Sequence, residues 1–246
     1  MKILSGLLWQ TAVPDADNMH SLFIKQFDSR KGPLFMALIC AATVEDKRPG
    51  AACSDQAAYA TFIGGYFCEE MQAWFEESYL GIILGKKPFA RIKRELLKTQ
   101  RRICEELELK AAKDQQKIRL SFALLISFRR DFIIMQQGAV KLYMLKRRMK
   151  DMGVDGQLKS GKGRLRPGLG ILLGSESFTS GISEQQLMGA LRAKDLRDEQ
   201  LINKRLSHIA EYAATATKRQ AAKQGSAQTD RAAIYISTLW GSSPQS

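Results

Sequence analysis

The side chains able to do chemistry are few, and their spacing excludes the common catalytic motifs. Cys40, Cys53, Cys68 and Cys104 show no C-x-x-C spacing and lie in apolar or helical contexts, which predicts buried, reduced thiols. The chain has no P-loop, no G-x-S-x-G motif, and no cysteine that the sequence pairs with a histidine. Gly161-Lys162-Gly163 could bind a phosphate, although a flexible Lys/Gly loop is the commoner meaning of such a sequence.

Positive charge is the other chemical feature, and it is unevenly spread. The net charge is +13; residues 1–80 carry 6 basic and 10 acidic side chains, whereas residues 81–246 carry 32 and 15. Lys86 to Arg102 holds eight basic residues, and Lys141 to Arg166 holds nine. Such patches attract acidic or phosphorylated proteins or nucleic acid. A solvated helix face and a basic loop remain the alternative explanation.

Hydrophobic periodicity predicts the elements that carry these residues. Residues 54–78 and 89–113 have apolar stripes at helical spacing, and the first stripe is aromatic and typical of a core. A capping box at Ser183 predicts a helix to about Arg192, and a long final helix follows around residues 202–216.

Strands are expected elsewhere. Leu34 to Ala41 is a continuous apolar run suited to burial on both faces. A meander of adjacent antiparallel strands is predicted at three places (119–127, 131–136 and 141–145) and single strands at 171–174 and 230–237. Residues 149–170 are rich in glycine and cations and predict a mobile loop.

This order of elements predicts a single domain over residues 1–237, with a flexible tail at 238–246. The fold class is α+β: two stacked antiparallel sheets with helices outside, an α/β/β/α sandwich. No apolar run reaches the roughly 18 residues of a membrane span. The stretch Ile3 to Trp9 is too short for a signal sequence, so we expect a cytoplasmic protein.

Several segments, in order, resemble motifs of the metal-dependent type-2C Ser/Thr protein phosphatases (the PPM family). Gly32 to Cys40 resembles the strand before the Asp-Gly-x-Gly-Gly motif, and Gly138 to Met144 resembles Gly-Asp-Ser-Arg-x-Tyr-Leu. Gly174 to Phe178 resembles the region of Ser-Asp-Gly, and Asp230 matches the closing Asp-Asn-x-Thr. The resemblance spans roughly residues 8–237 and implies the same four-layer sandwich.

The resemblance also implies that the metal-binding acids are largely absent. In the family, aspartates hold two divalent metals that activate a water for attack on phosphorus. The positions that correspond to the metal site are His20, Ala41, Ala42, Ala139, Glu176 and Asp230. We call this set the vestigial metal edge. His20, Glu176 and Asp230 remain able to bind a single ion, Mn or Mg, although an ordinary strand histidine is the favoured explanation of His20.

The leading interpretation is therefore a pseudophosphatase without catalytic residues or cofactor, which acts as a binding or regulatory module. We expect its cleft to be partly collapsed, because alanine and valine replace acids. Its partner would be an acidic or phosphorylated protein, such as a component of a Ser/Thr kinase pathway. The predicted contact surface, called the basic surface below, comprises Lys146, Arg147, Arg148, Lys159, Lys162, Arg164 and Arg166.

Two alternatives stay open. One is a divergent Mn- or Mg-dependent phosphoprotein phosphatase that retains a reduced metal site through Glu176 and Asp230. The other is a nucleic-acid-binding protein that uses the cations of residues 86–102. The aromatic residues there fall on the buried stripe, which disfavours a stacking platform for bases.

Overall fold

The computed structural model describes most of the chain as ten strands and five helices. The described residues are 2–10, 20–46, 53–152, 158–166, 168–180, 182–192, 195–224 and 230–239. The strands are β1 (Lys2–Gln10), β2 (His20–Phe27), β3 (Leu34–Asp46), β4 (Gln116–Phe128), β5 (Asp131–Gln137), β6 (Lys141–Leu145), β7 (Met149–Asp151), β8 (Lys159–Arg164), β9 (Gly170–Gly174) and β10 (Arg231–Leu239). The helices are α1 (Cys53–Ile83), α2 (Phe89–Lys113), α3 (Glu176–Thr179), α4 (Glu184–Ala190) and α5 (Glu199–Gln224).

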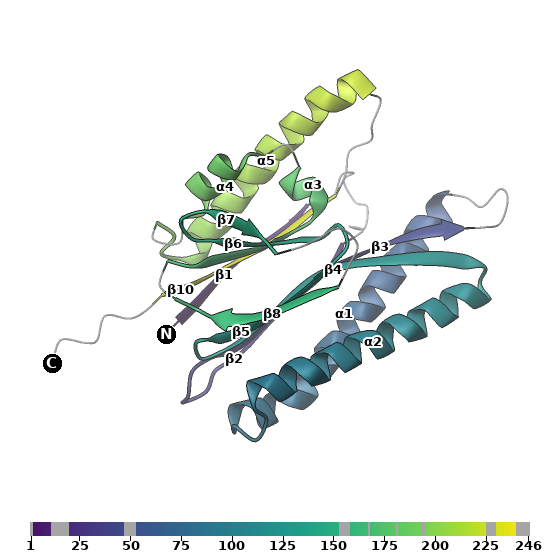
Figure 1. Cartoon of the computed structure of the whole chain (residues 1–246). Helices are drawn as coiled ribbons and strands as arrows, with labels where there is room; N and C mark the ends of the chain where they lie inside the picture. Colours follow the sequence, from purple (N-terminus) through teal and green to yellow (C-terminus); the bar gives the residue numbers. More distant parts are fainter. Residues whose placement is uncertain are drawn as a thin grey trace.

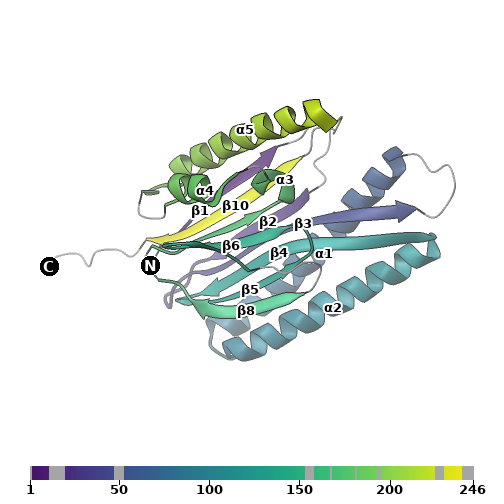
Figure 2. The ribbon, with the colours of Figure 1, turned by 45° about the horizontal axis from the view of Figure 1, so that its top comes forward.

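The strands form two five-stranded antiparallel sheets that stack face to face. The first sheet has the order β1-β10-β9-β6-β7, and the second has the order β2-β3-β4-β5-β8. Helices α1 and α2 cover the outer face of the second sheet, and α3, α4 and α5 lie on the other side of the sandwich (Figure 1). The predicted α/β/β/α sandwich is confirmed, and Figure 2 shows the same layers from above.

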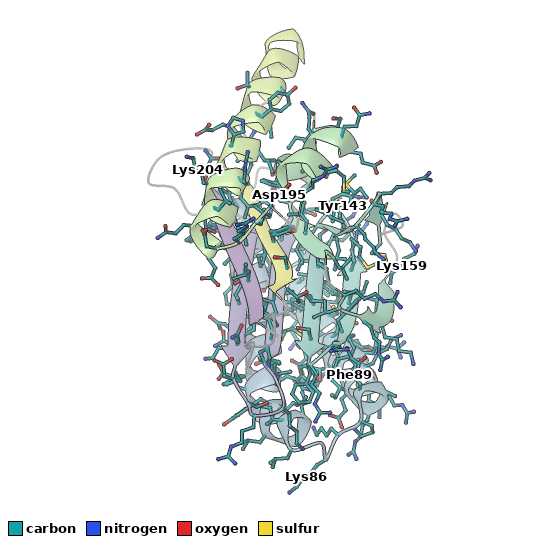
Figure 3. All side chains as sticks on the ribbon, turned by 90° about the vertical axis from the view of Figure 1, so that its left-hand side faces the viewer. Lys86, Phe89, Tyr143, Lys159, Asp195 and Lys204 are labelled. Carbon is teal, nitrogen blue, oxygen red and sulfur yellow. The ribbon has the colours of Figure 1, made fainter. Side chains whose placement is uncertain are left out.

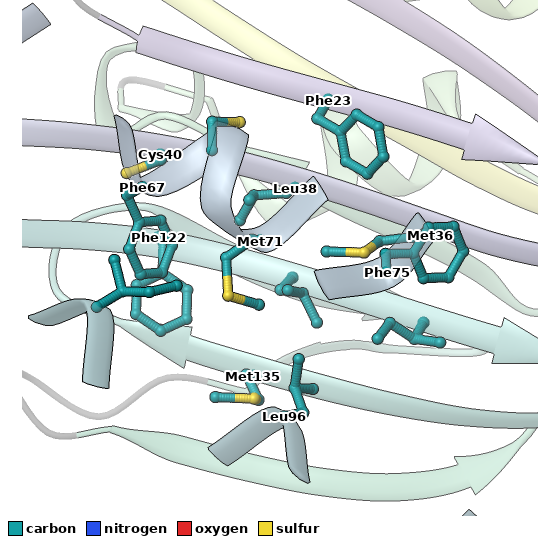
Figure 4. Packing of buried hydrophobic residues seen from close by; sticks show 14 of the residues in the cluster. Phe23, Met36, Leu38, Cys40, Phe67, Met71, Phe75, Leu96, Phe122 and Met135 are labelled. Atoms are coloured by element: carbon teal, nitrogen blue, oxygen red, sulfur yellow. The ribbon is translucent and has the colours of Figure 1, made fainter. Parts of the chain in front are cut away.

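Three hydrophobic clusters fill the three interfaces between the four layers. β3 shows how the sequence produces them. Met36, Leu38 and Cys40 pack with α1 and α2 (Figure 4), whereas Ala37 and Ile39 on the opposite face pack between the two sheets. The third cluster joins the first sheet to α3, α4 and α5. The continuous apolar run therefore reflects burial on both faces, as predicted.

Four expectations about the elements are wrong in detail. β6 does not continue a meander with β4 and β5, because the chain crosses to the first sheet and β6 pairs with β9 and β7. The predicted loop at 149–170 contains the edge strands β7 and β8. β3 runs on to Asp46, five residues beyond the predicted run that ends at Ala41. β10 includes two residues of the predicted tail, and 240–246 lie outside the described residues.

The helices agree more closely with the prediction. α1 extends five residues beyond the expected end, and the bounds of α2 are as predicted. Among the described helices, none combines the length and hydropathy that crossing a bilayer requires.

The cysteines described with their side chains are free thiols. Cys40 and Cys68 are buried as predicted, whereas Cys104 is only partly buried. Burial raises the pKa of Cys68 to about 12 and that of Cys104 to about 11. These thiols are therefore protonated and poorly nucleophilic near neutral pH.

Candidate functional site

The vestigial metal edge begins as a row of paired residues in the second sheet. His20, the first residue of β2, is paired with Ala41 of β3, and Ala41 is paired with Ser121 of β4. Ala41 is half-buried against the cluster between the sheets, whereas Ala42 points to the other face and is buried under the helices. The side chains in this row of the second sheet are therefore small or neutral.

β3 and β4 continue past this row as a two-stranded ribbon. Their pairing extends without interruption to Asp46 and Gln116, whereas β2 ends opposite Ala41 and β5 ends opposite Phe122. Figure 1 shows the ribbon projecting beyond the other strands. The segment that the resemblance aligns with a metal-binding loop is therefore regular strand in this chain.

The turn between β5 and β6 lies next to Ser121, at the other end of this row. Gly138 adopts a left-handed φ of +71°, and the N–H of Ala139 donates a hydrogen bond to Ser121 Oγ at 3.1 Å. Ala139 is exposed, and Val140 is buried in the cluster between the sheets. The retained glycine serves the turn, and the two residues after it carry no acid.

Glu176 and Asp230 lie at the same end of the first sheet. Ser175 follows β9, and its Oγ accepts hydrogen bonds from the N–H groups of Phe178 and Ala232 at 3.2 and 3.1 Å. Ser177 Oγ donates to the backbone carbonyl of Asp230. These bonds attach α3 to the start of β10 and leave Glu176 exposed in the first turn of the helix.

At this end of the sandwich, the charge of Asp230 affects the pKa of both His20 and Arg231. Burial lowers the pKa of His20, and the negative charge of Asp230 opposes that shift. Burial also lowers the pKa of Arg231, and the negative charge of Asp230 again opposes that shift. His20 and Asp230 are therefore close enough to interact across the sandwich.

The donor set does not fit a metal pair. Within the described ranges, no three or more His, Cys, Asp or Glu side chains form a group that could hold a metal ion, and His20, Glu176 and Asp230 all lie in those ranges. Hard divalent cations need several oxygen ligands. The resemblance places Ala41 and Ala139 at two of the metal-binding positions, and an alanine side chain supplies no ligand.

An open cavity of about 610 Å³ lies beside this edge, between α2, the ribbon and the β5–β6 turn. Ala139 lines this cavity, whereas Val140 is buried between the sheets, and the partial collapse of the cleft stays a prediction. The charged residues that line it, which the sequence analysis did not single out, are Glu108, Arg119 and Lys141, together with the predicted Glu176. Arg119 also forms an ion pair with Glu45 at 3.0 Å. The cavity therefore has mixed charge, without a concentration of either sign.

Most of the basic surface lies away from the vestigial metal edge, although Lys159 pairs with Gln136 near the end of β5 that reaches this edge. Lys146, Arg147 and Arg148 form the turn between β6 and β7, and the other four members lie on or just after β8. Because Lys141 pairs with Gly174 and Leu145 with Gly170, this turn is at the end of the first sheet remote from the vestigial metal edge. Lys159 projects from the side of the sandwich where β7 and β8 form the sheet edges (Figure 3).

The cations of the two basic segments differ in their pairing. Four of the eight in residues 86–102 form ion pairs with glutamates; these are Lys87, Arg91, Arg101 and Arg102. Of the seven members of the basic surface, only Arg164 forms an ion pair within the described part of the chain, with Asp131 at 3.3 Å. The basic surface is therefore the less neutralised of the two.

Comparison with known proteins gives structural matches only. No protein-family model matches the chain, and no curated protein matches it. Among solved structures, the serine/threonine phosphatase Stp1 from Staphylococcus aureus has a TM-score of 0.69 at 11% identity, over 98% of this chain and 96% of that one. The catalytic domain of the serine/threonine protein phosphatase PstP, in complex with two manganese ions, has a TM-score of 0.63 at 10% identity, over 97% and 99%.

A third match has a regulatory description. PppA of Pseudomonas aeruginosa, a key regulatory component of T6SS, has a TM-score of 0.60 at 12% identity, over 97% of this chain and 99% of that chain. The matches extend over nearly the whole length of both partners in each comparison, and the sheets and helices described above account for them. The chain therefore has the fold of the bacterial PPM-type serine/threonine phosphatases.

Proposed function

We propose that this chain is a pseudophosphatase: a protein with the phosphatase fold that binds an acidic or phosphorylated protein partner and does not hydrolyse phosphoesters. One observation carries the proposal. At the edge where the fold's metal site is expected, Ala41 and Ala139 replace carboxylates, and the described His, Asp and Glu side chains do not form a ligand group. Losing a metal-activated water removes many kcal/mol of transition-state stabilisation, at a tenfold loss of rate per ~1.4 kcal/mol.

The basic surface supports the binding part of the proposal. Six of its seven cations make no ion pair within the described residues, so their charge is available to an anionic partner. PppA shows that a protein of this fold can be described as a regulatory component. We infer a regulatory role in Ser/Thr phosphorylation signalling, with an acidic or phosphorylated protein as partner.

The divergent phosphatase is retained as a second candidate because Glu176 and Asp230 lie at the same end of the first sheet, where Ser177 joins α3 to the start of β10. Calorimetric titration with Mn²⁺ and Mg²⁺, with phosphate release from a phosphopeptide followed in the same samples, separates the two. We expect neither stoichiometric metal binding nor turnover. Metal-dependent turnover that is lost in Asp230→Ala would refute the pseudophosphatase and establish the reduced metal site.

A further inference from the structure

A groove of about 550 Å³ lies between the β6–β7 turn and α4, at the end of the first sheet remote from the vestigial metal edge. Lys146 and Arg147 line it from the turn, and Arg192 lines it from the segment after α4. Arg192 is not a member of the predicted basic surface. The fold thus adds a third cation, 45 residues away in sequence from Arg147, to two that the sequence analysis had selected.

The described residues that line the groove give it a positive charge. Lys146, Arg147 and Arg192 are exposed, and none of them forms an ion pair with a described residue. Among the described residues, no acidic side chain lines the groove. Glu184 lies beside it, where its carboxylate accepts the N–H of Met149 at 2.8 Å and forms no ion pair with a described cation. Asp195 follows Arg192, with its N–H bonded to the Arg192 carbonyl at 2.9 Å.

The floor of the groove is apolar. Leu145 and Leu191 are buried, and Met188 is partly buried against the cluster between the first sheet and its helices. An anionic group bound by the three cations would therefore sit next to a surface that can accept an apolar side chain. A concave site with an apolar floor and a few convergent polar groups is the usual form of a ligand pocket.

The walls of the groove are held in place by hydrogen bonds. A capping box between Ser183 and Gln186 fixes the start of α4. Tyr235 Oη donates to the carbonyl of Leu191 at 3.0 Å and so ties the end of α4 to β10. The bond from Met149 to Glu184 joins the β6–β7 segment to α4. Fixed walls lower the entropy cost of binding.

We propose that this groove binds a phosphorylated serine or threonine side chain within a peptide segment of a partner protein; this inference rests on the proposed function and names the site and its ligand class. A phosphate ester carries a charge near −2 and three acceptor oxygens. Two guanidinium groups can each donate two parallel hydrogen bonds to such oxygens, and Lys146 adds a further charge. Clusters of arginine are a recurrent means of recognising phosphorylated motifs.

The remote position of the groove distinguishes it from a retained substrate site. The phosphate would bind at the Leu145 end of β6, whereas the vestigial metal edge lies at the Lys141 end. The groove therefore holds a phosphorylated residue without placing it near Glu176 or Asp230. Binding there requires no metal and cleaves no bond.

The test uses the full chain and a degenerate peptide library centred on phosphoserine. Enriched peptides are measured by fluorescence anisotropy against the same sequences with Ser or Glu at the centre, and phosphate release is followed in parallel. We expect the phosphopeptides to bind at least about tenfold more tightly than their Ser forms, because two or more charge-assisted hydrogen bonds are gained. Equal affinity for the Ser forms, or no enrichment, would overturn the proposal.

Charge-reversal variants locate the site. Arg147→Glu and Arg192→Glu should each weaken phosphopeptide binding by at least about tenfold. Arg94→Glu makes the same charge change at an exposed arginine of α2 and should leave affinity within about twofold. If either arginine variant unfolds, Lys146→Glu tests the same groove from the β6–β7 turn. An equal loss of phosphopeptide affinity in Arg94→Glu would mean that net charge alone explains the effect. The groove would then not be the binding site.

The remaining outcomes separate this proposal from the one on which it rests. Phosphopeptide binding that is insensitive to Arg147→Glu and Arg192→Glu would refute the groove and leave the pseudophosphatase standing. Metal-dependent phosphate release would refute the pseudophosphatase whatever the groove binds. Binding to phosphatidylserine vesicles with the same sensitivity, without preference for phosphopeptides, would refute a peptide ligand.

Discussion

Ser121 and Ala139 join β4 to the β5–β6 turn, because Ser121 Oγ accepts the N–H of Ala139 at 3.1 Å. Gly138 lies against the same serine, with a left-handed φ of +71°. In the phosphatase family, the resemblance places an aspartate at the position of Ala139. Here a hydroxyl from the neighbouring strand accepts a hydrogen bond from the turn and so helps to hold it in place.

The first prediction concerns Gly138→Ala. A Cβ at this position would overlap the side chain of Ser121 and approach its Cα to 3.1 Å. We expect a loss of about 1–2 kcal/mol of unfolding free energy from the left-handed backbone, and a further loss of about 1–3 kcal/mol from overpacking. Chemical denaturation measures the sum.

Gly168→Ala is the matched control for this prediction. Gly168 has a φ of +77°, and a Cβ there would meet nothing within 4 Å. It should therefore lose only the backbone contribution. If the two variants lose the same free energy, the contact between Gly138 and Ser121 does not constrain the turn.

The layers of the sandwich were predictable because periodicity reports burial directly. Leu34 to Ala41 is apolar throughout, since alternate residues of β3 enter different clusters. The sheet to which a strand belongs was not predictable in the same way. β6 follows β5 after a short turn, as a hairpin strand would, yet Val140 and Leu142 pack between the sheets from the opposite side.

Edge strands and distant contacts account for the other errors. β8 contains Gly161 and Gly163 between cations, so it lacks the apolar alternation of a half-buried strand, although it pairs with β5 over six residues. The groove at α4 forms because the fold brings Arg192 near Arg147, and no local sequence pattern predicts that proximity. The residues of the vestigial metal edge could be named from the sequence because the resemblance depends on residue identity alone.

The second prediction is that Ser175→Ala destabilises the protein. Ser175 is completely buried, and its hydroxyl accepts the N–H groups of Phe178 and Ala232. The N–H of Ala232 would lose this acceptor in a buried environment, at about 1–3 kcal/mol, whereas the N–H of Phe178 keeps the backbone carbonyl of Ser175 at 3.1 Å. Chemical denaturation should show a larger loss than for Ser183→Ala, which removes an exposed N-cap worth roughly 0.5–2 kcal/mol. Equal losses would mean that α3 is not held to β10 by this hydroxyl.

The third prediction concerns the pH dependence of stability through His20. Burial lowers its pKa below the usual 6.5, so the unfolded chain binds a proton more readily than the folded one. The stability that neutral His20 contributes is fully present above about pH 7.5 and is lost as pH falls through the folded-state pKa. His20→Gln should therefore lose less stability than the wild type between about pH 7.5 and pH 5.5.

Asp230→Asn provides the complementary test of His20. The carboxylate of Asp230 favours the charged imidazole, so its removal should lower the His20 pKa further. The loss of stability on acidification should then be steeper than in the wild type. Identical pH profiles for the wild type and His20→Gln would show that His20 does not titrate differently on folding.

The fourth prediction is that α2 is not a nucleic-acid-binding surface. Lys87 and Arg91 both pair with Glu95, and Arg102 pairs with Glu70 and Glu106, so releasing these cations to phosphates would break existing contacts. Phe89 is partly buried and packs against the core, which disfavours its stacking on a base. We expect weak binding of single- and double-stranded DNA, with a shallow dependence of affinity on salt.

Reversing the charge of Arg94 and Lys98 together should change this affinity little. A steep fall of affinity with salt, lost in that double variant, would restore the nucleic-acid hypothesis, because only direct phosphate contacts by those two cations explain both results.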